Sequence, residues 1–470
     1  MLFNSVTFAI FLPIVFAIYW MLQRNVRWQN LFVVGASYVF YGWWDWRFLT
    51  LIAFTSALSY VAGRRIQGGN QAKTWLTLAI VVNIAILALF KYYNFFVQSF
   101  ADIFLGGNAD KMLLNLILPV GISFYTFQAI GYVIDVYRKR LPATDDVVAF
   151  FAFVSFFPQL VAGPIERATH LLPQFAQRRK FNYHLAADGM RQMLWGLFIK
   201  TVVADRCGWY VDTVFEQYGI YSGGTLIVAA LLFSVQIYGD FAGYSNIAIG
   251  CAKLFGIELM QNFKTPYFSR DIAEFWRRWH ISLTSWFRDY LYYPLGGSRG
   301  STAKTLRNTF IIFLVSGLWH GANWTFIAWG LYNAVLFAPL IVTHNNHRFQ
   351  TVVASQKVLP TAKELLQMVL TFALCTVGWI IFRSSSMVSA YYYIGRMVHL
   401  RSGVTLGLPW ITIAAVAIMF IAEWTNREKP HALHGILPHA AWLRPIVYLG
   451  LAACIALLST QSQNFIYFQF

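Results

Sequence analysis

Two histidines have side chains suited to acid–base chemistry, and one of them lies in hydrophobic surroundings. His320 lies inside an apolar run, and His280 lies forty residues before it, among tryptophan and arginine residues. An ionisable side chain at membrane depth is energetically unfavourable and is usually retained for function. A neutral imidazole, with a pKa of roughly 6.5, can take a proton from a hydroxyl at neutral pH and release it later. The two histidines therefore indicate chemistry inside a membrane protein rather than passage through one.

The composition shows what kind of elements must position these histidines. The 470 residues are 58% hydrophobic, 18% aromatic and only 12% charged, whereas soluble domains average about 25% charged residues. Because a spanning helix needs roughly 20 apolar residues, we expect an all-α polytopic membrane protein. It should have about eleven transmembrane helices plus re-entrant helices. The candidate segments cover residues 3–22, 29–46, 49–63, 74–98, 113–136, 147–163, 190–204, 225–250, 309–320, 324–342, 365–382, 408–424 and 442–460.

The net charge of +17 comes from basic residues spread through short loops, so it does not predict a nucleic-acid partner. Basic residues recur at 24–27, 64–73 and 138–140, between apolar segments. This distribution fits the excess of lysine and arginine in cytoplasmic loops. It predicts that the N-terminus and the C-terminus are both extracytoplasmic. The first apolar segment lacks a basic leader and a clear cleavage site, so we expect it to be retained as a helix.

We expect one membrane domain over residues 1–470, with N-terminal spans in 1–110, a catalytic core in 118–345 and C-terminal spans in 365–470. The core differs from the flanking parts because it combines polar residues at membrane depth with many glycines and prolines. Irregular backbone in a membrane is tolerated only where protein or a wet cavity covers it. A cavity is therefore expected in this middle part.

The two histidines are expected at two depths of that cavity. Aromatic residues recur at helical spacing from Asp271 to Tyr293, but this stretch carries too many charges to span the membrane, so we expect an interfacial or re-entrant helix on the cytoplasmic side. The next apolar stretch begins near Asn308. Its twelve residues to His320 cover roughly 18 Å of a core about 30 Å thick, which places His320 past the midplane. The break after His320 should end or bend that helix.

At these motifs the chain resembles the membrane-bound O-acyltransferase family (MBOAT), and most closely the branch that O-acetylates alginate, other polysaccharides or peptidoglycan. The resemblance covers most of the chain. It is carried by Phe275-Trp-Arg-Arg-Trp-His280-Ile-Ser-Leu283, Trp286-Phe-Arg-Asp-Tyr-Leu-Tyr-Tyr-Pro294-Leu-Gly-Gly297, Gly317-Leu-Trp-His320-Gly321, Asn262-Phe263 with Pro266-Tyr267, and Val161-Ala-Gly-Pro-Ile-Glu166-Arg167. The family implies a ring of helices around a central funnel, with His320 required for acyl transfer and His280 as its partner on the cytoplasmic approach.

The site residues have assigned roles and alternatives. His320 is expected as a general base, although an acyl-histidine intermediate and a simple buried histidine remain alternatives. His280 would polarise the donor or relay protons, or only bond within its own helix. Either Asn323 or Ser316 would orient the ring or stabilise the oxyanion. Candidates for the phosphates of a coenzyme A donor, or for anionic lipid heads, are Arg277, Arg278, Arg299 and Lys304. Candidates for the cavity lining, or for interhelical hydrogen bonds, are Asp240, Tyr244, Asn246 and Glu166.

No metal site and no tightly bound cofactor are expected. The other paired histidines, His344 with His347 and His431 with His434, lie in loops without cysteine or carboxylate ligands nearby in sequence. The four cysteines are isolated and show no metal or redox spacing. Phosphate-binding, dinucleotide-binding and serine-nucleophile motifs are also missing from the sequence.

These observations favour an O-acetyltransferase of the bacterial cytoplasmic (inner) membrane. It would move an acetyl group from a cytoplasmic thioester, with acetyl-CoA as the expected donor, to hydroxyls of an extracytoplasmic polysaccharide or peptidoglycan. A periplasmic or extracellular acyltransferase partner is expected to complete the transfer. The alternatives are D-alanyl transfer to teichoic acid, acylation of a membrane lipid, and non-enzymatic transport of an acyl donor. A transporter is disfavoured because the sequence shows no internal repeat.

Overall fold

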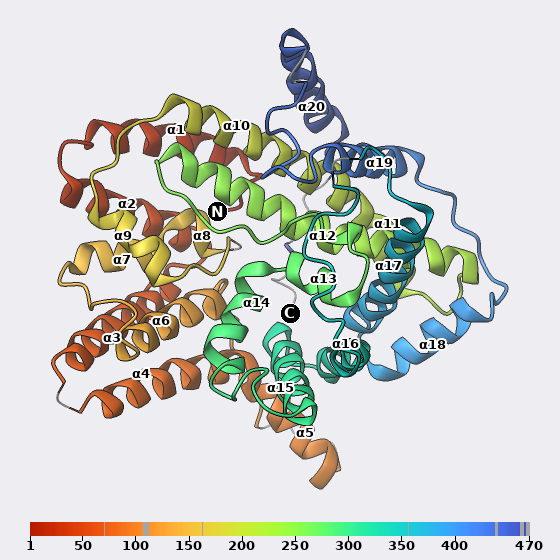
Figure 1. Ribbon diagram of the computed structural model, residues 1–470, viewed down its shortest axis with the longest axis horizontal. Coiled ribbons are helices and arrows are strands. Elements are labelled where there is room, and N and C mark those ends of the chain that lie inside the picture. Colours follow the sequence, from red (N-terminus) through yellow and green to blue (C-terminus); the bar gives the residue numbers. More distant parts are fainter. Residues whose placement is uncertain are drawn as a thin grey trace. The chain divides into compact units, whose positions relative to one another are not determined.

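The computed structural model describes residues 1–69, 71–106, 112–161, 163–355, 357–437, 440–460 and 465–466. Within these residues every regular element is a helix, apart from one isolated β-bridge between Tyr221 and Val404 (Figure 1). The all-α prediction is therefore confirmed. The packing divides the chain into two compact units, Met1–Met190 with Ala248–Met260, and Arg191–Ile247 with Gln261–Phe470. These units do not coincide with the parts 1–110, 118–345 and 365–470.

The first unit begins with nine α-helices, interrupted by a short 3₁₀ helix η1 and a π-helical turn η2. The elements are α1 Val6–Met21, α2 Val26–Gly42, η1 Trp46–Phe48, α3 Leu49–Gln67, α4 Ala72–Leu87, η2 Ala88–Tyr92, α5 Tyr93–Phe104, α6 Ile122–Tyr137, α7 Val147–Ser155, α8 Phe157–Leu160 and α9 Ala168–Ala176. Figure 1 shows α3, α4 and α6 side by side, and these three helices pack against one another.

Two helices, α10 and α12, extend over a boundary between the units, and the elements from α13 onward lie in the second unit. The elements are α10 Tyr183–Leu197, η3 Phe198–Ala204, α11 Asp205–Glu216, α12 Gly223–Leu254, η4 Pro266–Phe268, α13 Ile272–Arg278, α14 Ile281–Phe287, η5 Arg288–Tyr292, α15 Thr302–His320, α16 Trp324–Val342, α17 Ala362–Arg383, α18 Met387–Val398, α19 Trp410–Thr425, η6 Ala441–Leu443 and α20 Arg444–Leu458.

Four helical stretches in the described residues are long and apolar enough to cross a membrane: Ala72–Phe104, Gly223–Leu254, Trp324–Val342 and Ala362–Arg383. Three shorter apolar helices are α1, α19 and α20. All seven overlap segments that the sequence predicts as spans. The total of about eleven spans stays a prediction, because many of the remaining predicted segments form helices that are shorter or less apolar.

A buried ion cluster ties together three helical segments of the second unit. Lys200 of η3 contacts Asp205 of α11 at 2.7 Å and Asp240 of α12 at 2.6 Å. The three side chains are almost fully buried, with exposures of 1%, 2% and 5%. Asp240 also accepts a hydrogen bond from the backbone N–H of Ile466, at 2.6 Å. A buried charge requires such pairing, so this cluster fixes η3, α11 and α12 in one arrangement.

Helices α15 and α16 form a closely packed pair (Figure 1). Two glycines permit the approach: a Cβ on Gly317 would collide with the carbonyl oxygen of Phe326, and a Cβ on Gly330 would collide with that of Phe313. Small residues at such crossings let helix backbones come together in membrane proteins. This contact sets the position of the end of α15, where His320 lies.

Candidate active site

His320 is the last residue of α15 and is 3% exposed. The helix begins at the cap Ser301, whose hydroxyl accepts from the backbone N–H of Lys304 at 3.4 Å. It ends at Gly321, which has an extended backbone, and α16 starts after the cap Asn323. The predicted break after His320 is therefore confirmed, and it leaves the imidazole at a helix end rather than along a helix face.

His280 lies between two short helices instead of within one continuous helix. The helical spacing from Asp271 to Tyr293 predicted a single helix, and this expectation was wrong: α13 ends at Arg278, α14 begins at Ile281, and η5 follows. His280 has a left-handed backbone, with φ 43° and ψ 54°. Non-glycine residues rarely adopt this conformation, and when they do, surrounding contacts usually hold it.

Asn262 provides those contacts. It is 1% exposed. Its backbone carbonyl oxygen accepts from the backbone N–H of Ile281, the residue after His280, at 2.8 Å. Its side-chain Oδ1 accepts from the Ser282 hydroxyl at 2.6 Å, and its Nδ2 donates to the Ser245 hydroxyl on α12 at 2.9 Å. Asn262 thus connects the start of α14 to α12 and holds the bend that contains His280.

The two histidines line one small cavity of about 60 Å³ within the second unit. Their ring centroids are 6.5 Å apart. The cavity is small, so the space between the two rings suits a small group. The lining residues are Trp276, His280, Leu283, Thr284, Phe287, Ile312, Phe313, Ser316 and His320.

Aromatic rings surround both imidazoles. The centroids of Trp319, Trp329 and Phe382 lie 5.0, 5.1 and 5.5 Å from that of His320. The Phe241 ring meets His280 edge-on at 4.7 Å. His280 lies outside the membrane-spanning helices, and its burial lowers its pKa well below the usual value. The His280 ring is therefore neutral at physiological pH, so it can donate one ring N–H as a hydrogen bond.

Of the two residues predicted to assist His320, the structure brings only Ser316 to the cavity. Ser316 lies one helical turn before His320 and is 8% exposed. The side chain of Asn323 is used elsewhere: its Oδ1 accepts from Thr325 N at 3.0 Å, and its Nδ2 donates to Ser385 O at 3.1 Å. The expectation that Asn323 orients the ring is not supported, because capping α16 directs its amide away.

The four predicted donor-binding cations fall into two groups. Arg277 donates to the carbonyl oxygens of Asn346 and Phe349, at 2.8 and 2.7 Å. Arg278 is buried and pairs with Glu274 at 2.8 Å. Both of these guanidinium groups therefore hold the α13 region together.

Arg299 and Lys304 differ from this first group. Both are exposed: Arg299 lies in the loop before α15, and Lys304 lies in the first turn of α15. Neither forms an ion pair with another described residue. Of the four cations, these two remain available to a ligand.

The predicted polar lining residues do not reach the cavity. Asp240 belongs to the Lys200 cluster, and the Tyr244 ring lies beneath the Lys200 ammonium at 5.7 Å. Asn246 accepts from Gln192 at 3.0 Å. Glu166, in the first unit, pairs with His170 at 2.8 Å and accepts from Met260 N at 2.5 Å. These four residues are used in interhelical or loop contacts, which was the alternative expectation.

Sequence reasoning gave no role to Asn262 or Lys200. Asn262 was noticed only as part of a motif, and its partners Ser245 and Ser282 are not apparent from spacing. A signal for Lys200 was present, because one lysine interrupts the apolar stretch 190–204. An ionisable residue in such a stretch requires a buried partner.

A family model for the membrane-bound O-acyltransferase family matches residues 138–375 of the chain. This range includes both histidines and the whole of the small cavity. Together with the relatives described next, it shows that the chain belongs to this family. The protein is thus a multi-pass membrane O-acyltransferase.

The relatives agree with this assignment over most of the chain. A probable alginate O-acetylase of Pseudomonas aeruginosa is 41% identical over 397 residues, covering 83% of this chain and 74% of that protein. A probable alginate O-acetylase of Azotobacter vinelandii is 37% identical over the full length of both proteins. The peptidoglycan O-acetyltransferase of Helicobacter pylori is 35% identical over 86% of this chain and 81% of its own length.

Replacing Asn262 by alanine should lower acyl transfer by roughly 100-fold, because small displacements of a reacting group have effects of that size. The change removes the side-chain bonds to Ser245 and Ser282 and so loosens the bend at His280. Turnover of the purified, folded variant measures the effect. The matched control is Asn83→Ala, since Asn83 is equally buried but donates only to Ala79 O in its own helix. Wild-type turnover in folded Asn262→Ala would contradict the positioning role.

Proposed function

We propose that the chain transfers an acetyl group from acetyl-CoA, reached from the cytoplasm, to hydroxyls of an extracytoplasmic polysaccharide or peptidoglycan. The observation that carries the proposal is the placement of His280 and His320 at one cavity, with ring centroids 6.5 Å apart. The names of the relatives, which are probable alginate O-acetylases and a peptidoglycan O-acetyltransferase, support the reaction class and the type of acceptor.

His320 acts as the general base. Its imidazole takes the proton of the attacking hydroxyl while the oxygen bonds to the thioester carbonyl carbon. The C–S bond then breaks, the coenzyme A thiolate leaves, and the proton returns from His320 to that sulfur. Ser316, one turn away, offers a hydroxyl to the oxyanion formed in between. His280 faces the same cavity and polarises the thioester or relays the proton.

The size of the cavity supports acetyl over longer acyl groups. The cavity volume of about 60 Å³ is small, which favours a short acyl group over a fatty chain. The exposed cations Arg299, just before α15, and Lys304, in its first turn, can meet the phosphates of coenzyme A.

The final acceptor on the polysaccharide is extracytoplasmic, so the hydroxyl that attacks at His320 is a first acceptor, and a second protein carries the acetyl group onward from it. We assign this step to a periplasmic or extracellular acyltransferase partner. The proposal also places the chain in the bacterial inner membrane, with both termini extracytoplasmic. The reason is that several of its short loops are rich in lysine and arginine, which is typical of cytoplasmic loops.

The test is release and transfer of label from [acetyl-¹⁴C]acetyl-CoA by the purified protein in nanodiscs, with and without extracts that contain the partner. Hydrolysis or transfer of the labelled acetyl group supports the proposal. Turnover only with a D-alanyl carrier protein would favour D-alanyl transfer instead. Movement of intact acetyl-CoA across the membrane without loss of the thioester would indicate transport and would overturn it.

Enlarging the cavity should change the preference for acyl length. Leu283 is 3% exposed and lines the cavity, so Leu283→Ala creates space beside both histidines. We expect the ratio of butyryl-CoA to acetyl-CoA turnover to rise by about tenfold, in line with the effect of one or two methylene groups in an apolar pocket. Leu226→Ala is the control, because Leu226 is fully buried but does not line the cavity. An unchanged ratio in folded Leu283→Ala would show that the cavity does not hold the acyl chain.

A further inference from the structure

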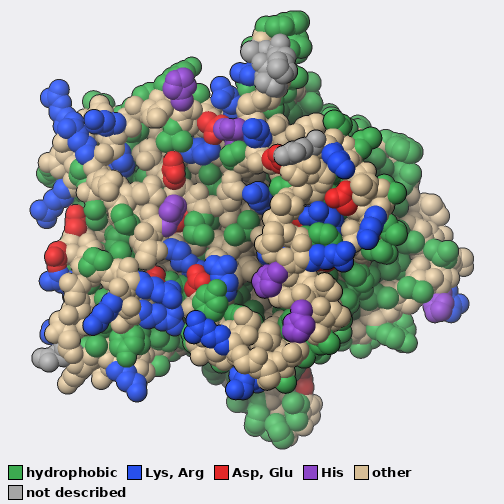
Figure 2. All heavy atoms as spheres, viewed as in Figure 1, with side chains coloured by type: hydrophobic (Ala, Val, Ile, Leu, Met, Phe, Trp, Pro, Cys, Tyr) green, Lys and Arg blue, Asp and Glu red, His purple; other side chains and the backbone are tan. Residues whose placement is uncertain are grey.

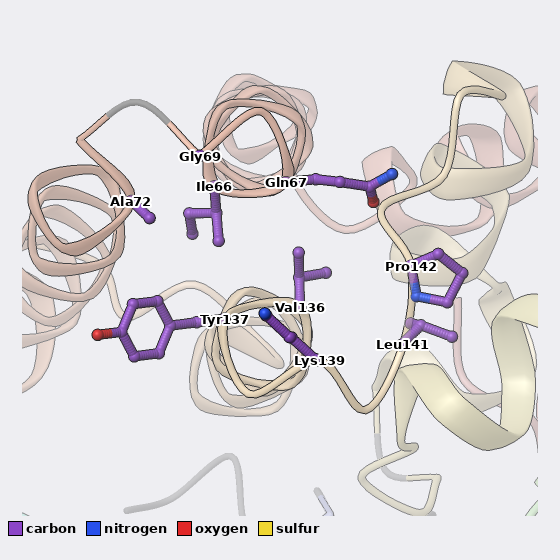
Figure 3. Close-up of a pocket in the computed structure, with 9 residues that line it drawn as sticks. All are labelled: Ile66, Gln67, Gly69, Ala72, Val136, Tyr137, Lys139, Leu141 and Pro142. Carbon is purple, nitrogen blue, oxygen red and sulfur yellow. The ribbon is translucent and has the colours of Figure 1, made fainter.

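The helical stretch Ala72–Phe104 consists of α4, η2 and α5, and it is longer than a membrane requires. Its 33 residues measure about 50 Å, whereas a hydrocarbon core is about 30 Å thick. The stretch begins at a polar surface, because Ala72 lines the same cavity of about 720 Å³ as the exposed side chains of Gln67 and Lys139 (Figure 3). From there, α4 and η2 together cover about 30 Å up to Tyr92. Helix α5 therefore begins where the hydrocarbon core ends.

The π-helical turn η2 separates α4 from α5, and the chain changes direction there. Figure 1 shows that α5 takes a different direction from α4 and that its end points away from the other helices of the first unit. Such π-turns are a known cause of helix kinks. Tyr92 and Tyr93 lie at the change of direction, and tyrosine is enriched where helices leave the hydrocarbon core. The kink thus coincides with the membrane surface that the length of α4 and η2 predicts.

Helix α5 has an apolar side and a polar side. Four exposed apolar side chains recur at helical spacing along one side: Phe96, Phe100, Ile103 and Phe104. In Figure 2, hydrophobic side chains cover the projecting end of α5 on the face in view. Gln98 and Asp102 lie on the opposite side, where Gln98 Nε2 donates to Asp102 Oδ1 at 2.8 Å. Helix α5 is therefore amphipathic, and its apolar side is not covered by the described part of the chain.

The π-turn also brings the apolar side of α5 into line with the exposed side of α4. Val81 and Phe100 are nineteen residues apart, and so are Ile84 and Ile103. Because a π-turn holds one residue more than an α-turn, each separation corresponds to about five α-helical turns. Val81 and Ile84 are 56% and 49% exposed, in a stretch whose apolar window is only 17% buried within the protein. The lipid-facing side of α4 therefore continues onto the apolar side of α5.

We propose that α5 lies on the membrane surface, with its apolar side in the boundary between lipid headgroups and acyl chains. Because α5 bends away from the rest of the first unit, the lipid-facing side of α4 becomes the side of α5 that faces the bilayer. Amphipathic helices bind bilayer surfaces in this way. The lipid also stabilises α5, which has 12 residues and, among the described elements, packs closely only against η2. So short a helix is marginal in water alone. This inference is independent of the proposed acetyl transfer.

The experiment is spin labelling of the full-length protein in nanodiscs of phosphatidylethanolamine and phosphatidylglycerol. Phe100→Cys, Ile103→Cys and Asp102→Cys are labelled one at a time in a Cys454→Ser background, since the other three native cysteines are buried. Power saturation measures collisions with oxygen, which dissolves in the acyl region, and with a polar nickel chelate, which does not. The oxygen-to-nickel ratio at Phe100→Cys and Ile103→Cys should exceed that at Asp102→Cys by about fivefold or more.

Two reference variants calibrate these ratios. Val81→Cys, on the lipid-facing side of α4, should give the high ratio of the acyl region. Lys180→Cys, at an exposed position in a loop of the first unit, should give the low ratio of water. An unchanged thermal unfolding midpoint confirms that each labelled variant keeps the fold.

Three results would overturn the proposal. Equal access of the nickel chelate to Phe100→Cys and Asp102→Cys would show that α5 projects into water. Low access of both reagents to Phe100→Cys would show that protein, such as a second copy of this chain, covers the apolar side. A ratio at Asp102→Cys as high as that at Val81→Cys would show that lipid surrounds α5 on all sides.

Discussion

Replacing His320 by alanine is expected to lower acyl transfer by about 10³-fold or more while leaving the fold intact. Loss of a positioned general base typically lowers the reaction rate by roughly 10²- to 10⁴-fold. The His320 ring lines the cavity beside His280, so its loss removes the base at the proposed reaction centre. The measurement is initial-rate turnover of labelled acetyl-CoA by purified His320→Ala in nanodiscs, with thermal unfolding as the test of folding.

The matched control is His431→Ala, because His431 is also a buried histidine of the second unit but does not line the cavity. This control variant should keep wild-type turnover. Equal rates in wild type and folded His320→Ala would contradict the assignment of the general base. Mass spectrometry of the acid-quenched wild-type enzyme separates the two routes: an acetyl group on the His320 peptide indicates a covalent intermediate, and an unmodified peptide indicates direct transfer.

The largest expected effect on stability comes from Lys200→Met. The substitution keeps the volume of the side chain but leaves Asp205 and Asp240 buried without their cation. Removing one member of a buried ion cluster typically costs about 3–5 kcal/mol, because the remaining charges lose their compensation. We expect a large fall in the thermal unfolding midpoint in detergent, or loss of the folded protein from the membrane fraction.

Two further variants test the cause of that loss. Adding Asp205→Asn and Asp240→Asn to Lys200→Met removes the uncompensated charges and should recover part of the stability. Lys253→Met is the control, since Lys253 pairs with Asp188 at 2.6 Å but is 14% exposed. Its effect should be much smaller, because partly solvated ion pairs contribute little. A similar midpoint for Lys200→Met and wild type would show that the cluster is not needed for folding.

Much of the helical framework was predictable because its signals are local. The segment predicted as 324–342 coincides with α16, and 309–320 has the same end as α15. The end is encoded by Gly321 and by Asn323, which is a favourable helix cap. Shorter helices such as α9, α11 and α18 were missed, because they are too short or too polar to give a spanning signal.

The candidate site was predictable only in part. His280, His320 and Ser316 line one cavity, whereas their motifs predicted the two histidines at two depths of one passage. The break at His280 was not predictable, because its left-handed backbone depends on Asn262, eighteen residues earlier. The capping bond of Asn323 was not predictable for a related reason, and it competes with any role of that side chain in the cavity. Local spacing carries no information on such competing bonds.

The left-handed backbone of His280 also bears on how this enzyme can evolve. A non-glycine residue in that conformation costs roughly 1–2 kcal/mol relative to a relaxed one, and glycine would relieve it. Glycine would also empty the space that the buried ring fills against Phe241, so stability alone favours a bulky side chain at this bend despite its strain. A lineage that lost the activity would therefore be expected to keep a large side chain there while losing the imidazole, and the residue at this bend would record whether the activity had been kept.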